Sequence, residues 1–292
     1  LKIDFMVPNL NSIDIYINKN NNGMYKFIQI SNTSQIKYLA AYAIDINYDY
    51  WLDIIAISDQ GIDFFIQTKP LEFKFTKNIP IKHAVSICVN DIDNDLDLDI
   101  YLTRNFKQSA LNGRNGAPNK LIENMGNSIF KLKSIPIIES TAFGLGCAIL
   151  DINNDSKNDI ILINEYSNDE LFIQGINKSF QNVSQSYNFN DTGSSRSLSI
   201  MDFNNDNHWD VFISMIDIFK NQMVIETSNK TSKIDEIRNT KLSKMGNKLF
   251  LGKKNGFSNG TQSIFEPKLH GWSWGNTFFD YDNDGDLDFY LT

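Results

Sequence analysis

Short apolar runs, separated by turns rich in Asn, Asp and Gly, make up most of the chain. Typical runs are IIAIS, IILIN and VFIS, and they are rich in Ile, Phe, Tyr and Val. Four to seven residues of this composition between turn residues favour strands over helices. Only 216–246 is compatible with a helix. The pattern therefore predicts an all-β chain.

A nine-residue acidic pattern recurs five times in one frame: Asp, x, Asp/Asn, x, Asp, three variable positions, Asp. The first aspartates are 46, 60, 51 and 78 residues apart, so a unit of about 46–51 residues repeats and two copies carry insertions. One strand candidate precedes each pattern and three follow it. The tail of a sixth copy ends at Asp4. The full copies are DINYDYWLD (45–53), DIDNDLDLD (91–99), DINNDSKND (151–159), DFNNDNHWD (202–210) and DYDNDGDLD (280–288).

Four strands in a unit of this length are typical of a propeller blade. A sandwich array is the alternative, but it does not favour a four-strand unit. We therefore predict a single all-β, β-propeller domain over 1–292, with about five to six blades. Because the chain begins and ends within repeats, we expect it to be part of a longer chain with six or seven blades. The predicted units are approximately 1–37, 38–82, 83–142, 143–193, 194–268 and 269–292.

The acidic loops have the spacing of a calcium site. Side chains at positions 1, 3 and 5 can face one cation, and the carbonyl of position 7 and the carboxylate of position 9 complete an oxygen shell. Oxygen ligands without Cys or His favour Ca²⁺ over zinc or copper. Turns without metal are the alternative, since Asp and Asn also form turns. We predict up to about five Ca²⁺ ions. The predicted ligands are Asp45, Asn47, Asp49, Trp51 and Asp53; Asp91, Asp93, Asp95, Asp97 and Asp99; Asp151, Asn153, Asp155, Lys157 and Asp159; Asp202, Asn204, Asp206, His208 and Asp210; and Asp280, Asp282, Asp284, Asp286 and Asp288, with Trp51, Lys157 and His208 acting through backbone carbonyls.

The five loops differ at position 6, which needs a residue that tolerates a positive φ. Gly285 suits this position, whereas Tyr50 and Leu96 do not. We therefore predict that 280–288 is the strongest calcium site and 45–53 the weakest.

The loops and their flanks resemble FG-GAP/VCBS repeats, as found in the calcium-binding propellers of integrin α-chains. A narrower resemblance is to the ASPIC/UnbV, or cartilage-acidic-protein-like, group. It rests on HGWSWGNTFFDYDNDGDLDFYLT (270–292) and APNKLIENMGNSIFKLKSI (117–135). The chain departs from the repeat pattern because four of the five loops lack Gly at position 6. The resemblance implies structural calcium, secretion or surface exposure, and adhesion or partner binding rather than catalysis.

The net charge of −8 on the whole chain arises from the acidic loops. The chain has 35 Asp plus Glu against 27 Lys plus Arg, which argues against a nucleic-acid surface. The five loops hold 19 Asp and one Lys, so the rest of the chain carries +10. Five bound Ca²⁺ ions would bring the whole chain to about +2. No apolar run is long enough for a membrane span.

Four other residues are candidates for chemistry. Cys88 and Cys147 both lie in apolar runs, and we expect buried free thiols rather than a disulfide bond or a reactive thiol. Trp272 and Trp274 alternate along a predicted first strand, so one face carries both rings. Packing between blades is the favoured role, and stacking on a sugar is the alternative. The three histidines lie in different units and suggest no triad or zinc site: His83, His208 and His270.

Two insertions, 104–118 and 216–246, follow the second strand of their units and should emerge on the face opposite the calcium loops. Loops on a rigid scaffold commonly carry function. We hypothesise that this face binds a protein or glycan, although both segments could be ordinary variable loops. We predict a secreted, cell-surface or periplasmic module for adhesion or partner binding. The alternatives are a polysaccharide lyase or hydrolase, a glycan-binding propeller and a structural subunit of a surface assembly.

Overall fold

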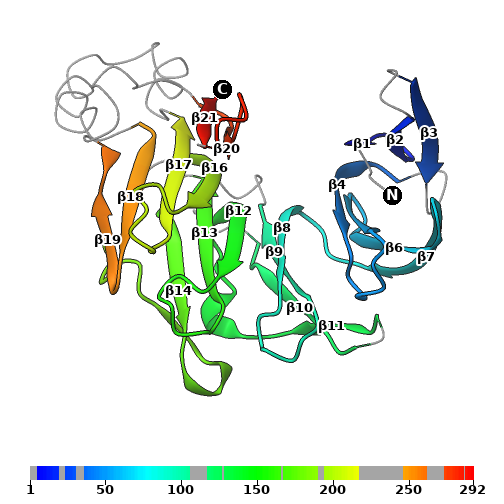
Figure 1. Cartoon of the computed structure of the whole chain (residues 1–292). Coiled ribbons are helices and arrows are strands. Elements are labelled where there is room, and N and C mark those ends of the chain that lie inside the picture. Colours follow the sequence, from blue (N-terminus) through cyan, green and yellow to red (C-terminus); the bar gives the residue numbers. More distant parts are fainter. Residues whose placement is uncertain are drawn as a thin grey trace, which may run out of the picture.

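A computed structural model shows sheets that follow one another along an arc (Figure 1). It describes residues 5–19, 24–30, 36–105, 117–126, 128–165, 167–189, 194–216, 246–261, 273–285 and 287–292. The predicted ligand Asp286, the tail residue Asp4, the side chains of Trp272 and His270, and most of both insertions lie outside these residues. The helix-compatible segment 216–246 also lies outside them, except at its two ends.

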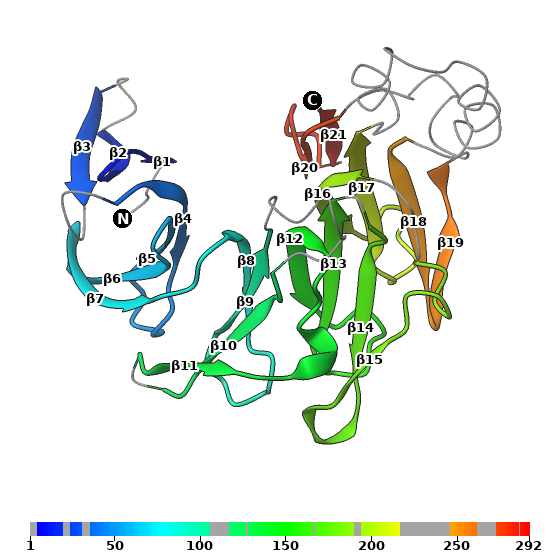
Figure 2. The same cartoon turned by 180° about the vertical axis from the view of Figure 1, so that it is seen from behind.

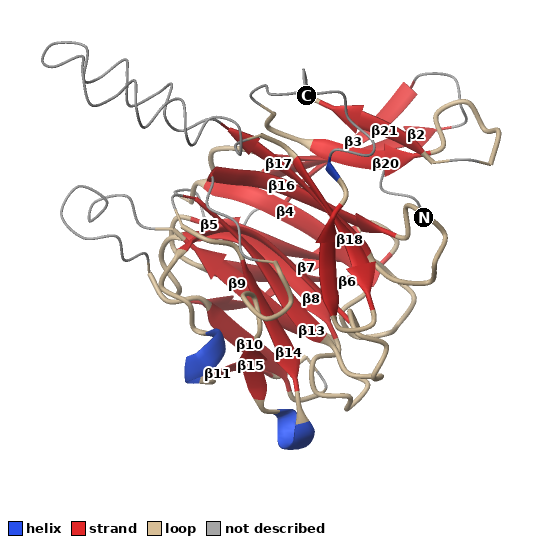
Figure 3. Cartoon of the chain, turned by 90° about the vertical axis from the view of Figure 1, so that its left-hand side faces the viewer, coloured by secondary structure: helices blue, strands red, loops and turns tan. Residues whose placement is uncertain are grey.

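Antiparallel strands dominate the described chain, with short 3-10 turns between some of them (Figure 3). The strands are β1 (Phe5–Pro8), β2 (Ile13–Lys19), β3 (Met24–Ile30), β4 (Tyr38–Ile44), β5 (Asp53–Ser58), β6 (Ile62–Lys69), β7 (Glu72–Ile79), β8 (Ala84–Asn90), β9 (Asp99–Arg104), β10 (Lys120–Asn124), β11 (Phe130–Lys133), β12 (Phe143–Leu150), β13 (Asp159–Glu165), β14 (Glu170–Gln174), β15 (Phe180–Asn182), β16 (Ser194–Met201), β17 (Asp210–Ile216), β18 (Lys248–Lys253), β19 (Gly256–Asn259), β20 (Asn276–Phe279) and β21 (Asp288–Leu291). The turns are η2 (Pro136–Ile138) and η3 (Ile176–Lys178).

The predicted four strands per unit are present in four sheets, β4–β7, β8–β11, β12–β15 and β16–β19. In each of them, strands adjacent in sequence are also adjacent in the sheet. The first sheet has three strands, β1–β3, and the last has two, β20–β21. Strands of this kind, stacked sheet upon sheet, are those of propeller blades.

The described sheets form an open arc rather than a closed ring. No described strand of the first sheet is hydrogen-bonded to β20 or β21. The first strand β12 contacts both β8 and β16, so the successive sheets lie side by side along the arc (Figure 2).

Each sheet packs on the next through a shared apolar cluster, one for each successive pair of sheets in 5–261. Between β4–β7 and β8–β11, the rings of Phe64 and Phe130 stack with their centroids 4.3 Å apart. At the last sheet, the ring of Phe212 lies edge-on to that of Phe289 at 4.6 Å. Since aromatic pairs add stability beyond their buried area, these contacts hold neighbouring sheets in a defined order.

The two cysteines correct the sequence-based expectation. Cys88 on β8 and Cys147 on β12 form a disulfide bond, with their Cα atoms 5.8 Å apart. The prediction of free thiols was wrong because the residues lie 59 positions apart in sequence. Their proximity arises only when the first strands of two sheets pack against each other. The bond therefore joins two sheets covalently.

The first strands of the four-stranded sheets share a register shift near their start. In β16 the pairing passes from Ser195 to Ser197, so that Arg196 is the extra residue of a bulge. The equivalent extra residues in β4, β8 and β12 are Leu39, Val85 and Leu145. Bulges of this kind change the direction in which a side chain points.

Candidate metal centres

All five acidic loops connect the first strand of a sheet to the second, and so occupy the same end of their sheets. Neighbouring loops also touch each other. The side-chain amide of Asn158 donates to the carbonyl of Asp91, and that of Asn154 donates to the carbonyl of Asn207. The three loops 91–99, 151–159 and 202–210 therefore form a continuous acidic surface.

The aspartate at position 1 organises each loop. In 91–99, the backbone N–H groups of Asp95 and Leu96 donate to the two carboxylate oxygens of Asp91, at 3.1 and 2.9 Å. The other four loops repeat both hydrogen bonds, with distances from 2.6 to 3.1 Å. Because these bonds involve backbone donors, the loop shape does not depend on the residues at positions 5 and 6.

Position 6 has a positive φ in every loop, as predicted. The angle is 69° at Tyr50, 73° at Leu96 and 95° at Gly285. The unfavourable residue types have thus not changed the backbone of their loops, and the ranking of sites by position 6 finds no support in loop shape. Position 4 also has a positive φ, from 57° to 61°, which the sequence analysis missed. The signal was present, since position 4 is Asn in four of the five loops: Asn94, Asn154, Asn205 and Asn283.

The aspartate at position 9 is the first residue of the second strand and is fully buried in four of the sheets. In loop 91–99, one oxygen of Asp99 accepts from the N–H of Ile92 and the other from the N–H of Asn124 on β10, at 3.2 and 2.8 Å. Burial raises the pKa of Asp53 to about 6 and that of Asp99 and Asp159 to about 7, although these hydrogen bonds oppose the shift. A bound cation would offset this cost of burying a carboxylate.

Two loops bring three carboxylates together so that one oxygen of each lies within 4.8 Å of the others. The groups are Asp91, Asp93 and Asp99, and Asp280, Asp282 and Asp288. In the other three loops position 3 is Asn, which offers an amide oxygen instead. Such an oxygen-only set suits a hard cation.

Asp93 provides a test of this fit. Its side chain is 7% exposed, and its buried Oδ1 has no hydrogen-bond partner among the described residues. A buried carboxylate oxygen without a partner is costly. A cation bound to Asp93 Oδ1 would take the place of the missing hydrogen bond. The residues of 91–99 therefore fit a calcium ion.

Position 7 is tied to position 5 by the backbone. In four loops the N–H of position 7 donates to the carboxylate of the aspartate at position 5, at 2.9–3.0 Å. The carbonyl oxygens of Trp51, Lys157 and His208 remain predicted ligands.

Two lysines that the sequence analysis missed contact Asp93 in loop 91–99. Lys178, in η3 of the neighbouring sheet, donates to Asp93 Oδ2 at 2.8 Å, and Lys133 Nζ lies 3.7 Å from the same atom. Burial alone would raise the pKa of Asp93, but the hydrogen bond and charge of Lys178 and the charge of Lys133 outweigh it and lower the pKa. No sequence signal marked Lys178, since it lies 85 residues from Asp93.

The opposite end of the sheets is chemically different. Arg104, which ends β9, donates from its guanidinium to the carbonyls of Lys82 and Pro118. Trp274 lies just before β20, and its side chain is 60% exposed instead of buried between sheets as expected. Arg196 lies over this ring, 5.0 Å from its centroid. Polar and aromatic groups therefore meet where the second strands end.

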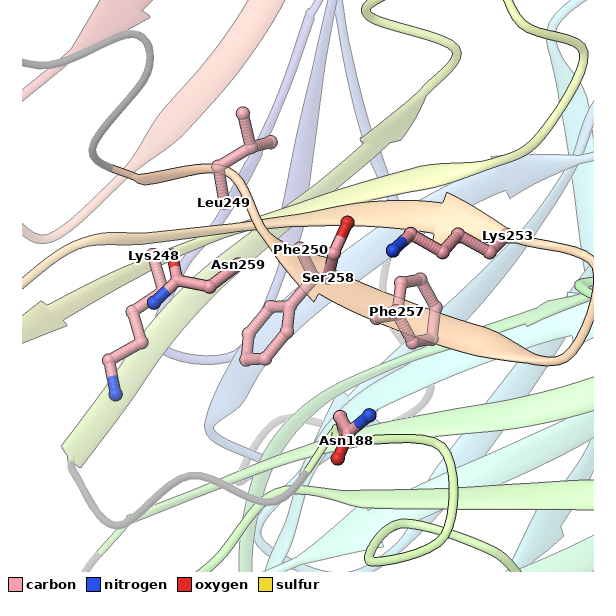
Figure 4. A pocket seen from close by; sticks show the side chains of 8 residues that line it. All are labelled: Asn188, Lys248, Leu249, Phe250, Lys253, Phe257, Ser258 and Asn259. Atoms are coloured by element: carbon pink, nitrogen blue, oxygen red, sulfur yellow. The ribbon is translucent and has the colours of Figure 1, made fainter.

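Two open cavities lie away from the acidic loops. One, of about 430 Å³, is lined by β18, β19 and Asn188 (Figure 4). Its rings, Phe250 and Phe257, are part of the apolar cluster between two sheets. The other, of about 410 Å³, lies between the first strands β8, β12 and β16 and includes Arg196. Only the second adjoins the polar groups at the far end.

The comparisons with known proteins agree with this architecture. Residues 151–213 match the family model of the FG-GAP-like repeat. This segment contains two of the five acidic loops, 151–159 and 202–210. The match supports the FG-GAP/VCBS resemblance.

One similar solved structure is that of an Agrocybe aegerita lectin, described for its specific recognition of non-reducing terminal N-acetylglucosamine. The TM-score is 0.56 at 14% identity, and the alignment covers 97% of this chain and 69% of the lectin chain. At this identity the likeness concerns the fold. A comparison with curated proteins finds no significant match. None of the described helices is long and apolar enough to cross a membrane.

Proposed function

We propose that this chain is a calcium-stabilised, non-catalytic binding module of the FG-GAP/VCBS type, with its ligand on the end opposite the acidic loops. The observation that carries the proposal is the fivefold repetition of one loop geometry. Each loop folds around the carboxylate of its position-1 aspartate. In two of the loops, positions 1, 3 and 9 also bring one carboxylate oxygen each within 4.8 Å of the others. A turn alone does not require a buried carboxylate at position 9 in four successive sheets.

Calcium is the cation that these loops suit best. The side chains at the ligand positions offer carboxylate and amide oxygens, and bound Ca²⁺ supplies the charge that offsets their mutual repulsion. The same ion would hold the first and second strands of each sheet together. We extend this proposal to all five loops, and the last loop also carries the ASPIC/UnbV-like sequence.

The ligand proposal rests on the division of the molecule into two ends. The acidic end is occupied by structural loops, which leaves the other end for recognition. The described ends of the two insertions, Arg104 and Ile216, lie at that other end, where β9 and β17 finish. The similar fold of a glycan-binding lectin favours a glycan, and a protein ligand is the second candidate.

We also propose an extracellular, cell-surface or periplasmic location. The disulfide bond between Cys88 and Cys147 supports it, since disulfides persist in oxidising compartments. Extracellular fluids also contain enough calcium to fill weak oxygen sites.

Thermal unfolding with calcium and with EGTA tests the calcium proposal. Because the ion binds the folded state, Tm should rise with free calcium. Each occupied site should add roughly 3 kcal/mol to the free energy of unfolding at a calcium concentration of a hundred times its Kd. An unchanged Tm, together with no calcium by elemental analysis, would refute it.

A panel of glycans, uronans and candidate proteins, assayed for binding and depolymerisation, tests the ligand proposal. Binding without turnover supports a binding module, and depolymerisation would make the chain an enzyme. Deletion of 221–242 should leave the calcium-dependent Tm unchanged and abolish capture of the ligand found in the panel.

A further inference from the structure

Four residues from four consecutive sheets meet at the end opposite the acidic loops. Glu165, at the end of β13, accepts from the guanidinium of Arg196 at 2.7 Å and from the side-chain amide of Asn105 at 3.3 Å. Arg196 in turn lies over the exposed ring of Trp274. The four side chains therefore form a continuous path that crosses three sheet boundaries.

Arg196 differs in residue type from the residues at the equivalent positions of the preceding sheets. It is the extra residue of the bulge in β16, and its counterparts in the three preceding four-stranded sheets are aliphatic: Leu39, Val85 and Leu145. The fold accepts an apolar residue at this bulge, so nothing in the repeat requires an arginine here. Bulges occur next to binding sites, where they direct one side chain toward a ligand.

The polar groups around Arg196 are incompletely paired. Three buried side-chain polar atoms at this end have no hydrogen-bond partner in the described residues: Arg196 Nε, Asn105 Oδ1 and Ser194 Oγ. Native proteins rarely leave such atoms unpaired. Donors and acceptors grouped in this way suit a ligand that carries several hydroxyl groups, either directly or through water.

The net charge of the group is close to zero. Arg196 and Glu165 are 10% and 7% exposed, and each neutralises the other. A carboxylate or phosphate would gain little here, because the guanidinium already has a buried anionic partner.

Trp274 supplies a flat apolar surface next to these groups. Its side chain is 60% exposed. The cavity of about 410 Å³ between the first strands is lined by Arg196, whereas Trp274 lies beyond its lining, on the other side of the guanidinium. Small-molecule sites commonly combine an aromatic surface with a few polar groups. The C–H face of a pyranose ring suits such an indole, and its hydroxyl groups suit the polar side chains.

We propose that Asn105, Glu165, Arg196 and Trp274 form a binding site for an uncharged pyranose of a glycan. This inference rests on the proposed ligand-binding function, to which it adds a location and a ligand class. Trp274 provides the stacking surface, and Arg196, held by Glu165, orients the hydroxyl groups.

The test uses the calcium-loaded chain and a glycan array that contains neutral saccharides and uronans, followed by titration of tryptophan fluorescence with the best neutral glycan. Trp274→Ala should weaken binding at least tenfold, and Asn105→Ala should weaken it severalfold. Tyr50→Ala removes a 95% exposed aromatic residue from the acidic end and should leave binding unchanged. Since Trp274 and Asn105 are far from the acidic loops, the calcium-dependent Tm of Trp274→Ala and Asn105→Ala should match that of the wild type.

The outcomes separate the two proposals. If a neutral glycan binds equally to the wild type, Trp274→Ala and Asn105→Ala, this site is refuted and the binding function stands. If the chain captures only a protein or only uronans, the pyranose class is refuted while the binding function stands. If it captures no ligand from the array or the protein panel, both proposals fail.

Discussion

Lys178 places its ammonium group 2.8 Å from Asp93 Oδ2, across the boundary between two sheets. Asp93 is also the position-3 aspartate of an acidic loop, so one carboxylate serves both an ion pair and a predicted calcium site. In the proposed calcium-bound state the two cations would share this carboxylate, which would link the calcium occupancy of one sheet to a contact with the next.

We therefore expect Lys178→Met to have opposite effects with and without calcium. In EGTA, removal of the ammonium leaves repulsion among the aspartates of 91–99, and Tm should fall. In calcium, the loop should bind the ion about two- to fivefold more tightly, as expected for loss of a competing ion pair of about 0.5–1 kcal/mol. Calorimetric titration measures the affinity. Lys69→Met, which breaks an exposed pair with Glu72, is the control and should change neither quantity.

The buried aspartates predict an unusual pH dependence of the calcium-free chain. The folded-state pKa values of Asp53, Asp99 and Asp159, about 6, 7 and 7, exceed the ordinary value of 3.8. Between about pH 4 and pH 7 these residues bind more protons in the folded state, so they stabilise the fold at the acidic end of this window. Their contribution is lost as the pH rises through 6–7. Urea unfolding in EGTA at several pH values measures this trend.

An asparagine variant isolates the contribution of one carboxyl group. Asp159→Asn cannot ionise, so its free energy of unfolding should depend less on pH between 5.5 and 8 than that of the wild type. Equal slopes for the two proteins would contradict the assignment. With saturating calcium, the wild type should instead become more stable as the pH rises, because the ion binds the deprotonated carboxylates.

The disulfide bond should contribute substantially to stability. Cys88 and Cys147 close a loop with a sequence separation of 59, for which chain entropy predicts about 4 kcal/mol. The double variant Cys88→Ser/Cys147→Ser should lose stability of this order in urea unfolding. Dithiothreitol should reproduce the loss in the wild type and have no effect on the variant. A wild type that is insensitive to reduction would show that the bond does not constrain the unfolded chain.

Leu96 offers a stabilising substitution. Its side chain is 80% exposed and its φ is 73°, a conformation that costs a residue with a branched side chain roughly 1 kcal/mol. Leu96→Asn and Leu96→Gly should therefore raise the free energy of unfolding by a few tenths to about 1 kcal/mol. Leu96→Ala keeps the Cβ atom and is the matched control, which should show no gain. A gain in the alanine variant would point to removal of an exposed leucine rather than to relief of backbone strain.

The sequence by itself determined the repeating architecture. Strand runs, turn residues and the acidic pattern are local signals, and they recur at a spacing that is typical of a four-strand unit. For the same reason the loops were located correctly, including the positive φ at position 6. The Asn at position 4 carried a similar local signal that was overlooked.

Only the tertiary structure decided what happens between sheets. The disulfide bond, the contact of Lys178 with Asp93 and the path from Asn105 to Trp274 all join residues from different units. The sequence of one unit does not show which side chains of the next unit it will contact, because these contacts depend on how the sheets stack. The acidic loops are thus largely readable from the sequence, whereas the contacts of the proposed site at the opposite end arise only through the packing of four sheets.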